Sequence, residues 1–194
     1  PERKSVLVEA SALLFADIPG AYAFLDRTYR QPYGFDARNS SLGTLRTAGV
    51  EVVDLPAVFG ALPAPGLAEE PWYEPADTHW SQRGLHVAAD AIIDALGWER
   101  IPGVYAVREE MIQRPADLAK LRSPGGTDGD RPKEPCLVVA DAQGRAPAAR
   151  PGSAEVLLLG DSFCRIFEEG EVTGAGLRSQ LAWRLGRPVG LIRQ

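Results

Sequence analysis

Two short segments carry residue types that could perform acyl transfer. Residues 157–163 read L-L-L-G-D-S-F, an apolar run that leads into Ser162, and residues 77–80 read D-T-H-W. A serine hydroxyl becomes a nucleophile when a neighbouring base, usually a histidine, takes its proton. A carboxylate on the other ring nitrogen fixes the tautomer of that histidine and stabilises its imidazolium form. Ser162, His79 and Asp77 therefore predict a catalytic set of serine, histidine and aspartate.

The Gly-Asp-Ser sequence follows an expected strand and precedes a helix that we expect over residues 163–168. In open α/β sheets, ligands bind at the carboxyl ends of strands, where the N–H groups of a helix start can stabilise an oxyanion. Gly160, Asp161 and Phe163 are the residues of this turn that could shape an oxyanion site around Ser162. The plainer alternative is that Ser162 or Asp161 only caps the helix.

Asp77 and His79 are two positions apart. Residues at this spacing in an extended backbone point to the same side, so the Asp77 carboxylate can reach the His79 ring. The chain has two histidines, His79 and His86, and His79 has the neighbouring acid that a catalytic set needs. The alternative is a capping aspartate beside a surface histidine. A zinc site of Asp77, His79 and His86 is disfavoured, because no C-x-x-C or H-E-x-x-H pattern accompanies them. We predict no metal and no other cofactor.

Aromatic residues near the candidate base could stack on a sugar ring. Trp72 and Tyr73 fall in a proline-rich stretch, residues 56–75, which we expect to be a loop. They are the stronger candidates for substrate contact, whereas Trp80 has the alternative of anchoring the core or the turn. Cys164 could act as a second nucleophile, but it falls inside the expected helix and a packing role is favoured.

Apolar strands alternate with helices along the chain, which predicts an α/β domain with a mainly parallel sheet. The clearest helix covers residues 81–96, with Ser81 as N-cap, an apolar stripe at helical spacing and Gly97 at the C-terminal end. Strands are expected over residues 5–8, 50–54, 104–107, 137–140, 156–159 and 189–192. Further helices are expected over residues 21–29, 40–48, 115–121 and 176–185, and a surface loop over residues 123–135.

Composition sets the broad class. The 194 residues are 45% hydrophobic and 24% charged, which suits a single globular domain over residues 1–194. The 21 basic and 26 acidic side chains give a net charge of −5, which argues against a nucleic-acid partner. No apolar run approaches the roughly 20 residues that span a bilayer. The chain starts at Pro1 and its single methionine is Met111. We therefore expect a chain trimmed at one or both ends.

The order of the two motifs resembles the SGNH-hydrolase-like domain of alginate O-acetyltransferases of the AlgJ/AlgX type. The matching residues are A-D-T-H-W-S at 76–81 with Gly84, and L-L-G-D-S-F at 158–163. Segments 116–118, 179–182 and 185–189 are similar as well, and the likeness runs from about residue 41 to residue 192. Ordinary SGNH esterases place Gly-Asp-Ser near the start and Asp-x-x-His near the end, whereas here the order is reversed and the spacing is Asp-x-His.

The resemblance implies a three-layer α/β sandwich with a permuted motif order. It implies that Ser162 takes an acetyl group, that His79 acts as general base and then acid, and that Asp77 orients His79. The acceptor would be a polysaccharide hydroxyl, and the acetyl donor, which a partner protein could present, is left open. The compartment would be extracytoplasmic, the periplasm or cell envelope, with membrane contact only through an anchor outside this chain.

Alternatives to the transferase remain open. Water in place of the sugar would make the domain an acetylesterase, and a non-catalytic carbohydrate-binding or scaffold relative would keep the fold alone. A lipid or thioester hydrolase is disfavoured by the arginine-rich, polar loops. SGNH enzymes use an asparagine as an extra oxyanion donor, but the single asparagine here, Asn39, is expected to cap a helix. Oxyanion contacts would then come from backbone N–H groups near Ser162, with an arginine as a further candidate.

Overall fold

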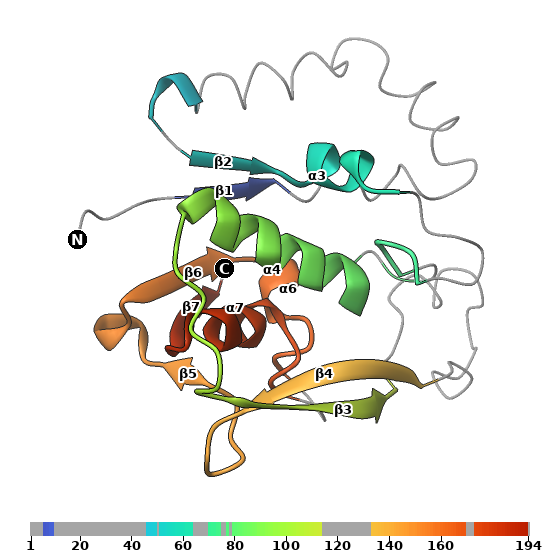
Figure 1. Ribbon diagram of the computed structural model, residues 1–194, viewed down its shortest axis with the longest axis vertical. Helices are drawn as coiled ribbons and strands as arrows, with labels where there is room; N and C mark the ends of the chain where they lie inside the picture. The colour runs from blue at the N-terminus through green and yellow to red at the C-terminus, as the bar shows by residue number, and fades with distance from the viewer. Residues whose placement is uncertain are drawn as a thin grey trace.

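Helix α4 (Gln82–Leu96) runs through the middle of the domain, with the first strand pair on one side and helix α7 (Leu177–Leu185) on the other (Figure 1). The computed structural model describes residues 6–9, 46–49, 51–63, 70–74, 77, 79–113, 133–169 and 173–193. The helices predicted over residues 21–29 and 115–121 lie outside these ranges, as does most of the predicted helix 40–48 and of the loop 123–135. None of the described helices is long and apolar enough to cross a bilayer.

The described strands form three small sheets. Strands β1 (Val6–Glu9) and β2 (Glu51–Asp54) are parallel, and so is the three-stranded sheet β5-β7-β6. Its members are β5 (Ala148–Ala149), β6 (Val156–Gly160) and β7 (Val189–Arg193). Strands β3 (Ala106–Ile112) and β4 (Glu134–Ala140) pair antiparallel.

The predicted mixed α/β class with parallel strand pairing is confirmed, but the described strands do not join into one mainly parallel sheet. The β3–β4 pair explains part of the difference. Strand β3 carries R-E-E in its middle and is mostly exposed, and an antiparallel pair can leave one face in water where a buried parallel strand cannot. This strand also starts and ends later than the predicted 104–107.

Helix α4 follows its sequence pattern closely. The Ser81 hydroxyl accepts a hydrogen bond from the Gly84 N–H at 3.1 Å, as expected of an N-cap. Gly97 ends the helix with a φ of 61°, a left-handed conformation that glycine adopts without strain. The predicted apolar stripe is buried in full: Leu85, Ala88, Ala89, Ile92, Ile93 and Leu96.

Two shorter helices differ from the prediction. Helix α3 (Leu55–Ala61) occupies the start of the stretch expected to be a loop. The Asp54 carboxylate caps it by accepting from the Ala57 N–H at 3.1 Å. Pro56 falls in the first turn, where proline is compatible with a helix. Helix α6 (Ser162–Arg165) ends earlier than residue 168, because Ile166 leaves the helical conformation with a ψ of 136° and Phe167 has a φ of 62°. A 3₁₀ turn, η3 (Pro151–Ser153), precedes β6.

A polar network joins α4 to α7. The Arg184 guanidinium donates to the Asp90 carboxylate at 2.7 Å and 3.1 Å and lies 3.5 Å from Nδ1 of His86. Because a guanidinium only donates, this contact is favourable when Nδ1 of His86 carries no proton. Burial, helped by the Arg184 charge and opposed by Asp90, lowers the pKa of His86 to about 4.

The lowered pKa of His86 predicts an acid-sensitive fold. Above pH 6.5 the ring is neutral in both states, so the full stability is present; as the pH falls from about 6.5 to about 4, the unfolded chain takes up a proton that the folded chain does not. Each pH unit in this window should cost up to about 1.4 kcal/mol. Urea midpoints measured against pH should fall less steeply for His86→Gln than for the parent, and equal slopes would contradict the assignment.

Candidate active site

A short antiparallel pairing presents the candidate base. Tyr73 and Trp80 form an isolated β-bridge. The Glu74 N–H donates to the His79 carbonyl at 3.1 Å, and the Ser81 N–H donates to the Trp72 carbonyl at 3.1 Å. Residues 72–74 and 79–81 therefore run side by side; His79 begins the second of these segments, and Asp77 comes two residues before it.

The Asp77 carboxylate contacts His79 twice. Its Oδ1 atom accepts from the His79 backbone N–H at 3.0 Å and lies 2.6 Å from Nδ1 of the ring. Asp77 is only 3% exposed, and the His79 side chain is 15% exposed. A carboxylate at Nδ1 holds the proton on that nitrogen, so Nε2, which is shielded from solvent, is left to accept a proton.

The start of α4 anchors this pairing. The Ser81 hydroxyl, besides capping α4, donates to the Pro71 carbonyl at 2.5 Å. The Glu70 carboxylate accepts from the backbone N–H groups of Gln82 at 3.1 Å and Arg83 at 3.2 Å. Burial raises the pKa of Glu70, and these two hydrogen bonds oppose the shift. Glu70 therefore acts as a second cap from twelve residues away, a role that sequence reasoning missed because no local pattern marks it.

The second segment is the turn between β6 and α6. Asp161 is the N-cap of α6, and its Oδ1 atom accepts from the Phe163 N–H at 3.0 Å. The capping alternative therefore holds for Asp161. Ser162 is the first residue of α6 and is half-buried, so its hydroxyl is not enclosed in the core. Burial raises the pKa of the Cys164 thiol to about 12, which keeps it protonated and unreactive at neutral pH.

The two segments, far apart in the sequence, meet through an aromatic contact. The Phe163 ring centroid lies 5.0 Å from that of His79 and 5.3 Å from that of Trp80. The residue next to Ser162 therefore touches the residue that would activate it. Within the described part of the chain, no hydrogen bond joins the Ser162 hydroxyl to the imidazole. Such bonds are often long in sites without substrate and tighten when the substrate is bound.

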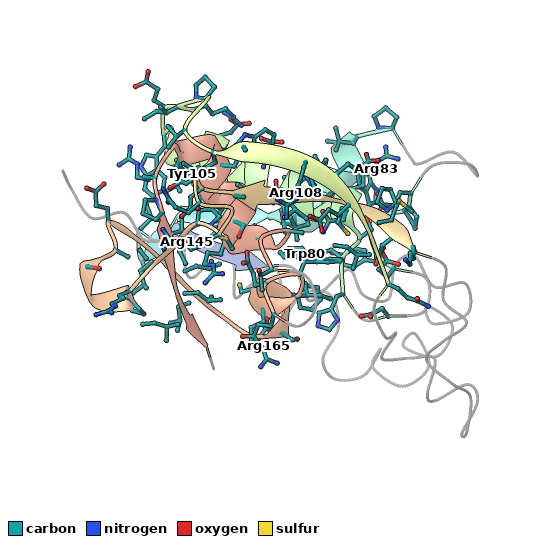
Figure 2. All side chains as sticks on the ribbon, turned by 90° about the horizontal axis from the view of Figure 1, so that it is seen from below. Trp80, Arg83, Tyr105, Arg108, Arg145 and Arg165 are labelled. Carbon is teal, nitrogen blue, oxygen red and sulfur yellow. The ribbon has the colours of Figure 1, made fainter. Side chains whose placement is uncertain are left out.

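The predicted sugar-contact residues are in the core. Trp72, Tyr73 and Trp80 are 6%, 5% and 1% exposed. Trp72 stacks on Phe59 with centroids 5.0 Å apart, and Tyr73 meets the same ring edge-on at 6.0 Å. Figure 2 shows Trp80 within the body of the domain. These rings leave little face for a sugar, so we do not include them in the proposed substrate site. Asn39 lies outside the described residues.

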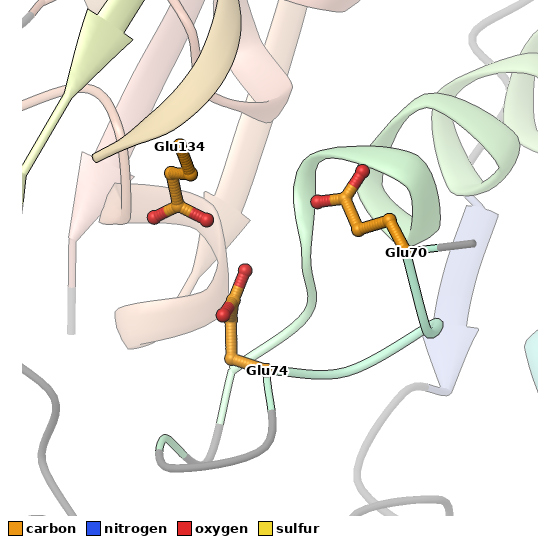
Figure 3. A group of neighbouring side chains, drawn as sticks. All are labelled: Glu70, Glu74 and Glu134. Atoms are coloured by element: carbon orange, nitrogen blue, oxygen red, sulfur yellow. The ribbon is translucent and has the colours of Figure 1, made fainter. Parts of the chain in front are cut away.

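Three carboxylates approach one another beside the base. Glu70, Glu74 and Glu134 each offer an oxygen, and these atoms lie within 4.8 Å of one another (Figure 3). Carboxylate groups of this kind can ligate a hard cation. Both oxygens of Glu70 already cap α4, however, so the cluster has a structural reason of its own. His86 belongs to the network with Arg184 and lies with neither this cluster nor Asp77.

The fold and the site define a class: an α/β domain in which a parallel strand ends in a Gly-Asp-Ser turn beside an Asp-x-His pair. No family model matches the sequence, and no curated protein matches it significantly. The solved structures that resemble the chain include the O-acetyltransferase domain of Pseudomonas putida AlgJ, with a TM-score of 0.64 and 17% identity over 98% of this chain and 63% of that one. Another is Pseudomonas aeruginosa AlgX, with a TM-score of 0.57 and 13% identity over 97% of this chain and 42% of that one.

The chain therefore has the fold of the AlgJ and AlgX structures, as its two motifs predict. It spans less than two thirds of the AlgJ chain and less than half of the AlgX chain.

Gly84 allows the segment of residues 70–74 to approach α4. A Cβ atom at this position would lie 2.1 Å from the Trp72 carbonyl oxygen, a backbone atom that cannot move without breaking the pairing. Gly84→Ala should lower the free energy of unfolding by about 1–3 kcal/mol or more. Gly60→Ala is the matched control, because that glycine lies in α3 with no atom within 4 Å of the added Cβ and should be neutral or stabilising. Thermal unfolding of both variants tests this; equal melting temperatures would contradict it.

Gly160 allows the Ser162 turn to close. A Cβ at residue 160 would lie 2.3 Å from Sγ and 3.0 Å from Cβ of Cys164. Gly160→Ala should therefore displace α6 and destabilise the domain by about 1–3 kcal/mol. Adding Cys164→Ala removes the closer of the two clashes and should restore part of the loss in denaturant titrations. A double variant that is no more stable than Gly160→Ala would show that this contact does not explain the glycine.

Proposed function

We propose that this domain transfers an acetyl group through Ser162 to a carbohydrate hydroxyl, as a carbohydrate O-acetyltransferase or, with water as acceptor, an acetylesterase. The observation that carries the proposal is the contact of the Ser162 segment with a histidine whose Nδ1 is held by a buried carboxylate. The likeness to AlgJ, described as an O-acetyltransferase domain, supports it at the level of the fold.

The chemistry assigns one role to each of the three side chains. Nε2 of His79 takes the proton from the Ser162 hydroxyl while Oγ attacks the acetyl carbonyl carbon. The resulting imidazolium, stabilised by Asp77, gives that proton to the leaving group of the donor. An acceptor hydroxyl then loses its proton to His79 and attacks the acetyl-serine ester, and the imidazolium returns the proton to Ser162 as the ester bond breaks.

The wider setting of the reaction belongs to the same proposal. The acceptor is a polysaccharide or other sugar, the donor is an activated acetyl group that a partner protein can deliver, and the compartment is extracytoplasmic. The complete fold is a three-layer α/β sandwich of the SGNH-hydrolase type with the motif order reversed. Gly160 and Asp161 shape the turn that carries the nucleophile, and no metal or cofactor takes part.

One observation favours a second candidate, a non-catalytic carbohydrate-binding or scaffold relative. The Phe163 N–H, a natural oxyanion donor next to the nucleophile, is bonded to the Asp161 carboxylate at 3.0 Å. The loss of one oxyanion donor typically lowers the rate by about 10²–10³-fold. If this bond stays formed, the Phe163 N–H cannot stabilise an oxyanion. Such a domain would bind sugar but transfer acetyl poorly.

Ser162 and Asp77 separate the two candidates. We expect Ser162→Ala to abolish labelling by a fluorophosphonate probe and the release of 4-nitrophenol from 4-nitrophenyl acetate. Asp77→Asn should lower the turnover by up to about 10⁴-fold, because the asparagine no longer fixes the reactive tautomer. Ser153→Ala is the control, since that hydroxyl bonds only to the Arg150 carbonyl in an exposed turn.

The scaffold alternative makes the opposite prediction. It expects the parent chain to bind polymer without reacting with the probe, and the Ser162→Ala variant to bind just as well. A parent that turns over acetate ester as fast as Ser162→Ala would overturn the acyl-transfer proposal. The ratio of acetylated oligosaccharide to free acetate then distinguishes a transferase from an esterase.

A further inference from the structure

The ring of Phe163 has a position that its backbone role does not explain. The backbone N–H of Phe163 donates to the Asp161 carboxylate, so this N–H does not point to a substrate in this conformation. Its side chain crosses from the nucleophile segment to the base segment and packs on two rings there. We propose that Phe163 is a positioning residue that fixes the plane of the His79 imidazole. This inference rests on the proposed acyl transfer through Ser162.

The imidazole is held from two directions. Asp77 holds it at Nδ1 through a single hydrogen bond, which still tolerates small tilts of the ring about the Cβ–Cγ bond. The phenyl ring of Phe163 lies against it with centroids 5.0 Å apart and planes inclined by 51°. Contacts of this kind between aromatic rings have preferred geometries. The hydrogen bond and the ring contact together therefore select one orientation of Nε2.

The phenyl ring is itself supported. Trp80, which is 1% exposed, meets Phe163 edge to face at 5.3 Å with an interplanar angle of 87°. Trp80 follows His79 directly, and both side chains contact the phenyl ring of Phe163. Two consecutive residues therefore pack against this ring. Removal of the ring would leave a void beside both of them.

The helix that carries Phe163 is tied to the rest of the domain. Within the segment that follows α6, the Phe167 carbonyl accepts from the Ala175 N–H at 3.1 Å. The Glu168 carboxylate accepts from the Ser179 N–H at 2.7 Å, from the Ser179 hydroxyl at 2.9 Å and from Arg178 at 2.8 Å. Since Ser162 and Phe163 are neighbours on one short helix, a shift of the phenyl ring relative to His79 is also a shift of the nucleophile.

The test compares Phe163→Leu and Phe163→Tyr with Phe167→Leu. Phe167 is the matched control, because it undergoes the same change in the same segment and is buried, whereas the phenyl ring that packs on the imidazole is that of Phe163. We expect Phe163→Leu to lower kcat and the rate of fluorophosphonate labelling by about 10- to 100-fold with little change in KM, since misplaced reacting groups cost rates of this order. Phe163→Tyr, which keeps the ring, should recover most of the rate. Phe167→Leu should lower the melting temperature without this loss of kcat per folded molecule.

A second measurement is independent of activity. The chain has two histidines, so the imidazole signals in a proton NMR spectrum can be assigned with His86→Gln. Loss of the phenyl ring should shift the His79 signals in Phe163→Leu and leave them in place in Phe167→Leu. If the parent enzyme is active and Phe163→Leu matches it in kcat, or the His79 signals do not move, the positioning role is wrong. A parent that neither labels nor turns over instead overturns the proposed function itself.

Discussion

The close approach of residues 70–74 to the start of α4 is the contact on which the candidate site depends. The Trp72 carbonyl accepts from the Ser81 N–H and lies where any side chain at residue 84 would have to be. The same Ser81 hydroxyl caps α4 and bonds the Pro71 carbonyl. The first turn of the helix and the pairing that carries Asp77 and His79 are therefore one unit, and neither can form in its present geometry without the other.

Hydrogen bonds at the start of α7 hold the segment that follows Ser162 in a similar way. Glu168 lies almost fully buried at the first turn of α7, and burial raises its pKa while Arg178 and the hydrogen bonds of Ser179 oppose the shift. The Gln82 side-chain amide donates to the Ala175 carbonyl at 3.2 Å, so the first turn of α4 also contacts the segment just before α7. The first turn of α4 and the segment before α7 are therefore joined directly. This link helps to hold together two segments that are distant in the sequence.

Local features of the site could be predicted from the sequence, and features that depend on distant partners could not. The Ser81 cap, the stripe of α4 and the contact of Asp77 with His79 follow from neighbours within a few residues. The second cap, from Glu70, was not predicted because this residue lies twelve positions before Gln82, whose backbone N–H it accepts from. The burial of Trp72 and Tyr73 was missed for a similar reason.

The strand pattern shows the same division. Apolar runs correctly placed most strands and the class of the fold, because a buried strand needs apolar side chains whatever its partner. They did not reveal which strands pair with which, and the antiparallel β3–β4 pair carries no turn signature within the described residues. The start of α3 was hidden by Pro56, which is typical of loops but is equally compatible with a first helical turn when Asp54 caps it.

If the site carries out the proposed reaction, access of water determines whether it favours transfer or hydrolysis of the acetyl group. The proposed base is enclosed: Asp77 is nearly fully buried and Nε2 of His79 is shielded from solvent. The proposed nucleophile is not, since Ser162 is only half-buried and Arg165, one turn further along α6, is exposed at the periphery (Figure 2). In the proposed reaction, the described residues would exclude water from the side of the acetyl-serine that faces His79 and would leave its outer side open. In a transferase built this way, the bound acceptor itself must cover the ester, so that acetyl transfer and exclusion of water become a single binding event.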